Sequence, residues 1–167
     1  MLETILFFVH GAVILLFGMT LTAAFAKIRG IRENALVFLG LYLLSGGLQI
    51  YITLFFSDLF VRKLYPVIVH LPLILLLYLY YRKTLPTALA ATFSAYLLCQ
   101  PAKWVGILVL RLTGSPTWEY AVQLVALIVV GYVGLVHVTS CLSDIYNKDW
   151  RSVSIFGIIP TVYYLFD

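Results

Sequence analysis

Two short polar clusters interrupt apolar stretches of this chain, and they are the first places to look for chemistry. One is H-L-P at residues 70–72, and the other is C-Q-P-A-K-W at residues 99–104. Ionisable groups below a membrane surface are costly and mark candidate functional sites. Because a basic turn at residues 81–84 separates the two segments, we predict antiparallel membrane helices. They would bring His70 and Lys103 to similar depth near one bilayer face.

Further polar side chains fall at the same predicted depth in neighbouring apolar segments. Such a set offers hydrogen-bond donors and acceptors, one fixed cation and aromatic walls. It suits a small amphiphilic, lipid-like or peptide signal that carries an anionic or amide group. The candidate ligand-binding residues are His10, Gln49, His70, Gln100, Lys103, Trp104 and Gln123.

A structural interpretation of the same residues stays open. Lys103 can extend its ammonium group to the outer headgroups. The glutamines can join neighbouring helices by hydrogen bonds worth about 0.6 kcal/mol each. For any single residue this is the commoner role, whereas the shared depth favours a ligand site for the group.

The composition places these residues in a membrane protein. Hydrophobic residues make up 63% of the chain, charged residues make up 11%, and the mean hydropathy is +1.03. Soluble domains are apolar over only about half of their residues. Several apolar runs reach the roughly 20 residues that cross a bilayer as a helix, and the period-two alternation of a membrane β-barrel is missing. We therefore predict an all-α, polytopic transmembrane helical bundle.

About six membrane segments are predicted from the apolar runs. Their approximate ranges are residues 4–26, 35–56, 66–81, 86–110, 120–137 and 153 onward. Pro101 predicts a kink in the fourth segment, where Tyr96 shares a helical face with Gln100 and Lys103. Small residues at 88–95 and at Gly131 predict a tightly packed half of the bundle beneath a looser half.

Basic residues predict the orientation, because Lys and Arg gather in cytoplasmic loops. One side of the predicted bundle receives Lys27, Arg29, Arg32, Arg82, Lys83, Lys148 and Arg151. The other side receives only Arg62, Lys63 and Arg111. The N-terminus and the polar candidate residues are thus predicted to lie toward the outside. Since the net charge of +4 resides at segment ends, it does not indicate nucleic-acid binding.

Catalytic motifs are scarce. The chain has no Gly-rich phosphate loop, no H-E-x-x-H motif and no serine nucleophile elbow. His137 and Cys141 lie four residues apart, which is the minimum for a membrane cysteine peptidase, but no third orienting residue is evident. Cys99 and Cys141 lack metal-ligand spacing and are predicted to pack. No metal, no cofactor and no catalytic activity are expected in this chain.

Three motifs together resemble a known family. They are P-V-I-V-H-L-P at residues 66–72, C-Q-P-A-K-W at residues 99–104 and I-P-T-V-Y-Y-L-F-D at residues 159–167. The chain is similar to the membrane-embedded N-terminal sensor region of Gram-positive, gut-type sensor histidine kinases that carry a GHKL-class ATPase domain. The resemblance implies a multi-pass protein of the bacterial cell membrane. It also implies a cytoplasmic kinase region, absent from this chain, that uses ATP and Mg and acts on a response regulator.

Residues 1–167 are accordingly predicted to form a single transmembrane sensor domain, as a homodimer in the lipid bilayer. An apolar run that still continues at Asp167 predicts a further helix before the kinase region. The leading function is sensing of an extracellular or lipid-phase signal. The alternative is the substrate-binding membrane subunit of a small-molecule, vitamin-type transporter, and the third possibility is a membrane cysteine peptidase.

Overall fold

The computed structural model describes residues 2–28, 34–56, 64–148 and 150–166. The chain is 91% helical, and the described residues contain no strand. The predicted all-α fold is therefore confirmed.

Six consecutive helical rods make up the described chain. The first two and the last are single helices. The third and fifth rods contain π-helical turns, and the fourth rod has a break between two α-helices. In chain order the elements are α1 (Leu2–Phe25), α2 (Ala35–Phe55), η1 (Pro66–His70), α4 (Leu71–Leu75), η2 (Leu76–Tyr80), α5 (Leu85–Leu97), α6 (Gln100–Thr113), α7 (Pro116–Val133), η3 (Gly134–Val138), α8 (Thr139–Tyr146) and α9 (Trp150–Phe166).

Four of the rods are long and apolar enough to cross a membrane: Leu2–Phe25, Ala35–Phe55, Leu85–Thr113 and Pro116–Tyr146. Pro66–Tyr80 is apolar but shorter, and α9 has 17 residues. A membrane protein with at least four spanning-length helices follows from length and composition. The count of six spans and the outside N-terminus stay predictions.

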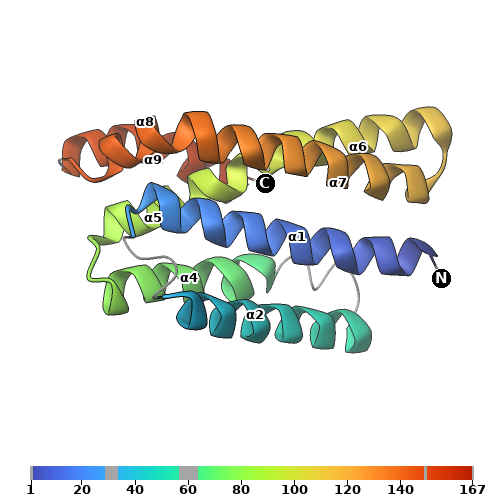
Figure 1. Ribbon diagram of the computed structural model, residues 1–167, viewed down its shortest axis with the longest axis horizontal. Coiled ribbons are helices and arrows are strands. Elements are labelled where there is room, and N and C mark those ends of the chain that lie inside the picture. The colour runs from blue at the N-terminus through green and yellow to red at the C-terminus, as the bar shows by residue number, and fades with distance from the viewer. Residues whose placement is uncertain (1, 29–33, 57–63, 149, 167) are drawn as a thin grey trace.

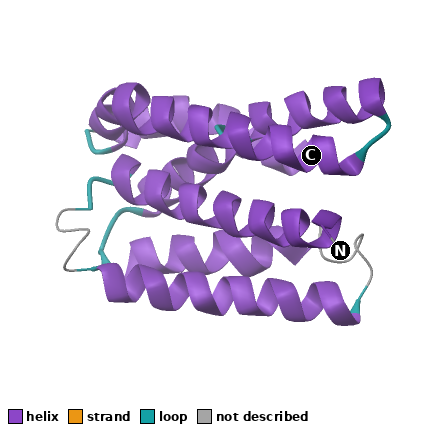
Figure 2. Ribbon diagram, turned by 45° about the vertical axis from the view of Figure 1, so that its right-hand side comes forward, coloured by secondary structure: helices purple, strands orange, loops and turns teal. Residues whose placement is uncertain are grey.

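Successive rods run in alternating directions and stack in three tiers (Figure 1). The tier of α6 to α9 lies on one side of α1 and α5, and the tier of α2 and α4 lies on the other (Figures 1 and 2). The C-terminal end of α1 and the N-terminal ends of α2 and α5 lie together at one end of the molecule. The N-terminus of α1, the C-terminal end of α2 and the turn between α6 and α7 lie toward the other end.

The central helix, α1, is buried along only part of its length. Its buried residues begin at Leu15 and continue to Phe25, whereas residues 2–14 are half-buried or exposed. The buried part packs against α5, whose Ala88, Ala91 and Ala95 are fully buried. Small side chains let helix backbones approach closely. The predicted tight packing of residues 88–95 is confirmed.

Local sequence explains where the fourth rod begins, breaks and ends. The Thr84 side chain caps α5 by accepting a hydrogen bond from the backbone N–H of Thr87 at 3.4 Å. The rod breaks at residues 98–99, and α6 then begins at Gln100 with Pro101 in its first turn, which has no N–H to donate. The predicted kink is thus confirmed. Gly114 ends α6 with a left-handed φ of 65°, where a side chain would be strained.

The third rod is π-helical at both of its ends. η1 and η2 are π-helical turns that flank the short α4. In η1 the N–H of Leu71 reaches the carbonyl of Pro66, five residues back. Single π-helical turns inside helices are frequent at functional sites, because the extra residue changes which side chains face a neighbour.

The fifth rod differs from its predicted extent. It continues without interruption from Pro116 to Tyr146, beyond the predicted range of residues 120–137. Asp144 therefore lies on α8, with Ser143 buried beside it. Helix propensity is a weak signal here, because contacts of α8 with α1 and α5 stabilise its polar residues.

Candidate functional site

A cavity of about 960 Å³ lies between the N-terminal half of α1, α2, the start of the third rod and the break between α5 and α6. Its volume is at the upper end of the range for small-molecule sites. Five of the seven predicted ligand-binding residues line this cavity: His10, Gln49, His70, Gln100 and Lys103. Helices far apart in the sequence thus bring these polar side chains to one space.

The structure does not bring the other two predicted residues to the cavity. Trp104 is 56% exposed and lies outside the lining. Gln123 is buried between α6 and α7, where its Nε2 donates to Glu119 Oε1 at 3.1 Å. A Cβ at Gly106 would overlap the Gln123 side chain, so the absence of a side chain at Gly106 makes room for this glutamine. Gln123 therefore packs α7 against α6, whereas its hydrogen bond stays within α7.

His70 forms a wall of the cavity within a group of aromatic rings. It is 1% exposed, and its ring centroid lies 4.5 Å from that of Tyr96. The rings of Tyr65 and Phe93 meet it edge-on at 5.4 Å and 5.8 Å. A Cβ at Gly18 would overlap the Tyr96 ring, so α1 approaches this group through a glycine. The packing holds the His70 ring in one orientation.

Four tyrosines line the cavity, Tyr42, Tyr65, Tyr96 and Tyr120, and none of them was among the seven predicted ligand-binding residues. Tyr42 on α2 donates its hydroxyl to the carbonyl of Ala12 on α1 at 3.2 Å. Tyr65 precedes the third rod, and Tyr120 on α7 stacks at an angle against His10 with centroids 5.9 Å apart. Aromatic hydroxyls near segment ends are typical of membrane interfaces, which is how sequence reasoning treats them.

The electrostatic character of the cavity is positive. Among the described residues of the lining, Lys103 is the sole Lys or Arg, and no Asp or Glu is present. Lys103 is itself exposed, and no carboxylate of the described part of the chain lies within salt-bridge distance of it. The buried Oε1 of Gln100 receives no hydrogen bond in that same part. The cavity thus offers a cation and an unsatisfied amide to a guest.

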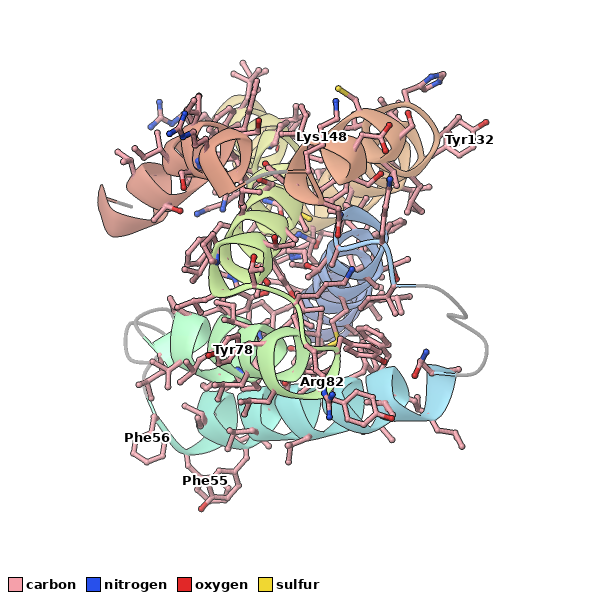
Figure 3. All side chains as sticks on the ribbon, turned by 90° about the vertical axis from the view of Figure 1, so that its left-hand side faces the viewer. Phe55, Phe56, Tyr78, Arg82, Tyr132 and Lys148 are labelled. Carbon is pink, nitrogen blue, oxygen red and sulfur yellow. The ribbon has the colours of Figure 1, made fainter. Side chains whose placement is uncertain are left out.

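The opposite end of the molecule is held by polar contacts. We call it the charged end and define it by Lys27, Arg82, Lys83, Asp144, Asn147 and Lys148. Figure 3 views the molecule from this side, with Arg82 on the tier of α4 and Lys148 on the tier of α8.

Three elements meet at the charged end through side-chain contacts. Lys27 forms an ion pair with Asp144. Lys83 Nζ donates to Asn147 Oδ1 at 3.1 Å, and Asn147 Nδ2 donates to the carbonyls of Phe25 at 3.1 Å and Ser143 at 2.8 Å. Asn147 therefore links the ends of α1 and α8 to the turn before α5.

Buried hydrogen bonds continue this attachment between α5 and α8. Thr87 Oγ1 donates to the carbonyl of Tyr146 at 2.9 Å. The hydroxyls of Ser94 and Tyr146 lie 2.6 Å apart. Because Tyr146 is 2% exposed, water does not compete for these bonds.

The His137 and Cys141 pair shows no catalytic arrangement. Both side chains are exposed, and no hydrogen bond joins them in the described structure. No group of three His, Cys, Asp or Glu side chains among the described residues can hold a metal ion. Cys99 is buried and packs, as predicted, with its Sγ 3.5 Å from the carbonyl of Ala95. Cys141 is exposed, so the packing prediction is wrong for it within this chain.

Comparisons with models of protein families, with curated proteins and with solved structures found no match. The fold and the site define the class of protein: an all-helical membrane protein with a polar cavity toward one end and a closely packed, charged opposite end.

Proposed function

We propose that this chain is the membrane-embedded sensing region of a bacterial sensor histidine kinase. The cavity binds an extracellular or lipid-phase signal, and the helices that line it carry a shift to a cytoplasmic kinase region. The observation that carries the proposal is the cavity, where five of the seven candidate ligand-binding residues come together. The three motifs that resemble such sensor regions support it further.

The connection between the two ends supports a relay. The third rod lines the cavity through Pro66 and His70, and directly after it Lys83 bonds to Asn147. α1 lines the cavity through Gly11 and ends beside Lys27, which pairs with Asp144. A helix shift of about 1–2 Å is a common form of switching. Such a shift of either rod would disturb the contacts of the charged end.

Charge distribution supports an orientation with six spans and the N-terminus outside. Within the described structure, the charged end holds Lys27, Arg82, Lys83 and Lys148, and Arg111 lies on the half of the molecule that contains the cavity. Cytoplasmic ends of membrane helices are enriched in Lys and Arg. Arg29, Arg32, Arg62 and Lys63, which enter the same prediction, lie outside the described residues.

The proposal includes the partners of such a kinase. The chain forms a homodimer in the bilayer, and the kinase region that follows it binds ATP and Mg and phosphorylates a response regulator. The natural reading frame tests this directly, since a stop codon after residue 167 beside genes for transport ATPases would contradict a sensor.

Two substitutions test the cavity as the sensing site. In the full-length protein in membrane vesicles, we expect His70→Ala and Lys103→Ala to impair the change in autophosphorylation that the signal causes. Membrane insertion should stay unchanged, because neither residue is among the cations of the charged end. Arg111→Gln is the matched control, since it removes a cation from α6 outside the cavity lining. A normal signal response in both cavity variants would contradict the proposal.

One observation favours a second candidate function, the substrate-binding membrane subunit of a vitamin-type transporter. The cavity volume suits a whole small molecule, as a carrier requires. Uptake of a labelled vitamin by cells that express the chain with its neighbouring ATPase subunits would support transport. Kinase activity in the same full-length chain would support sensing.

A further inference from the structure

We propose that the cavity takes a single-chain amphiphile with an anionic headgroup, either a carboxylate or a phosphate. The headgroup lies at Lys103 and the hydrocarbon chain lies along the glycine gap, which we define as the space beside Gly46 and Gly47 between α1 and α2. This inference rests on the proposed ligand-binding function of the cavity and specifies its ligand.

The headgroup follows from the charges around the cavity. In the described lining, the Lys103 ammonium is balanced by no carboxylate, so an anionic guest gains an ion pair and a cationic guest meets repulsion. Gln100 lies three residues before Lys103, hence one turn away on the same side of α6. Its amide can hydrogen-bond the same headgroup through either polar atom.

The chain follows from the shape of the α1–α2 contact. A Cβ built at Gly47 has no atom within 4 Å, and one at Gly46 has only Leu15 Cδ2, at 3.6 Å. Both glycines line the cavity together with Leu43 and Ile50. The missing side chains leave a space with apolar walls, which suits a hydrocarbon chain.

The route of entry follows from which lining residues are exposed. Leu43, Gly47 and Ile50 line the cavity and are exposed, so the cavity lining reaches the surface of α2. They recur at four- and three-residue steps and therefore form one edge of the helix. When α2 crosses a bilayer, this edge contacts lipid. The cavity thus opens sideways along α2, and an amphiphile dissolved in the bilayer reaches it without passing through water.

Photoreactive probes test the headgroup. Four probes share a dodecyl chain with a diazirine and carry a carboxylate, a phosphate, a hydroxyl or a trimethylammonium group. The chain is reconstituted in phosphatidylcholine nanodiscs, and labelled peptides are identified by mass spectrometry. We expect at least one anionic probe to label peptides around residues 11–15 and 43–50 about 10- to 100-fold more efficiently than the hydroxyl and ammonium probes.

The two anionic probes distinguish the possible sources of the ligand. Preferential labelling by the carboxylate probe supports a fatty-acid-like ligand, and preferential labelling by the phosphate probe supports a lysophospholipid-like ligand. Equal labelling by the hydroxyl or ammonium probe would overturn the anionic headgroup but leave the cavity as a binding site. Failure of all four probes to label the cavity peptides would overturn the inference, while the signalling response of His70→Ala and Lys103→Ala tests the proposed function separately.

Two pairs of variants test the positions of the headgroup and the chain. Lys103→Gln should lower labelling by the anionic probes about 10- to 100-fold and leave the hydroxyl probe unchanged, because one charged contact is lost. Arg111→Gln should change labelling by neither the anionic probes nor the hydroxyl probe. Unaltered labelling by the anionic probes in Lys103→Gln would overturn the headgroup position.

Gly47→Leu should abolish labelling by every probe, because its side chain fills the glycine gap. Gly40→Leu is the matched control, since Gly40 is exposed on the same helix, has open space around its Cβ and does not line the cavity. Equal thermal stability of the two variants would show that Gly47→Leu folds. Normal labelling of that folded variant would overturn the proposed chain position.

Discussion

The two ends of α1 lie in opposite environments. Its C-terminal half, from Leu15 to Phe25, is buried against small side chains of α5 and against residues of the fifth rod. Its N-terminal half borders a cavity lined by aromatic, amide and aliphatic side chains. In a bilayer, helices gain little from the hydrophobic effect between them, so close packing and hydrogen bonds decide where they join. Alanine, serine and threonine contribute to the helix contacts near the charged end, whereas aromatic rings line the cavity.

The contrast shows how one bundle can combine a binding site with a stable attachment. Near the charged end, Tyr146 bonds to Thr87 and Ser94. At the cavity, Gln100 Oε1 has no hydrogen-bond partner within the described chain. A buried polar group without a partner costs free energy, so a guest that supplies the partner is favoured. Substitutions of equal size at the two ends can therefore be compared directly.

The largest expected effect comes from enlarging a side chain at the packed end. Ala91 is fully buried on α5. Ala91→Leu should lower the free energy of unfolding by about 3 kcal/mol, because extra methylenes in a packed core force neighbouring helices apart. Thermal unfolding in the same detergent micelle measures the difference.

Gly47→Leu at the cavity is the counterpart of that substitution. Its new side chain meets no atom within 4 Å of the Cβ position, so we expect no loss of stability and a small gain from better helix propensity. Equal destabilisation by Ala91→Leu and Gly47→Leu would contradict the difference in packing between the two ends.

A smaller effect is expected from single hydroxyl groups. Tyr146→Phe removes the 2.6 Å contact with Ser94 in a fully buried setting and should cost about 1 kcal/mol. Tyr42→Phe removes the 3.2 Å bond to Ala12, which is exposed at the cavity side, and should cost less. Chemical or thermal unfolding of both variants gives the order. A greater loss in Tyr42→Phe would show that the cavity side carries more of the stability than we infer.

The sequence predicts the position of a residue along a helix axis better than its rotation about that axis. Depth along a helix follows from counting residues between turns, and for this reason His10, Gln49 and Lys103 were correctly grouped with the residues that line one cavity. The break before Pro101 was predictable as well, since it depends on a missing N–H.

Rotation about a helix axis was less predictable. In a soluble protein, an amphipathic pattern shows which face is buried. These helices are apolar on most sides, because lipid and protein neighbours are both apolar, so the pattern did not indicate that Trp104 and Gln123 lie away from the cavity. The π-helical turns of the third rod also shift which residues face inward, and propensity contains no signal for them.

The smallest expected effect on stability comes from the ion pair of the charged end. Lys27 and Asp144 are both largely exposed, with side chains 49% and 61% accessible, so solvent screens their attraction. Lys27→Ala and Asp144→Ala should each change the unfolding temperature less than Tyr146→Phe does. The effect of each alanine substitution should shrink further in high salt. A double-mutant cycle measures the coupling between the two residues. Strong coupling that persists in high salt would show that the pair is sequestered from water, for instance by the second chain of the proposed dimer. Weak coupling would leave the buried bonds of Tyr146 as the main polar attachment between α5 and α8.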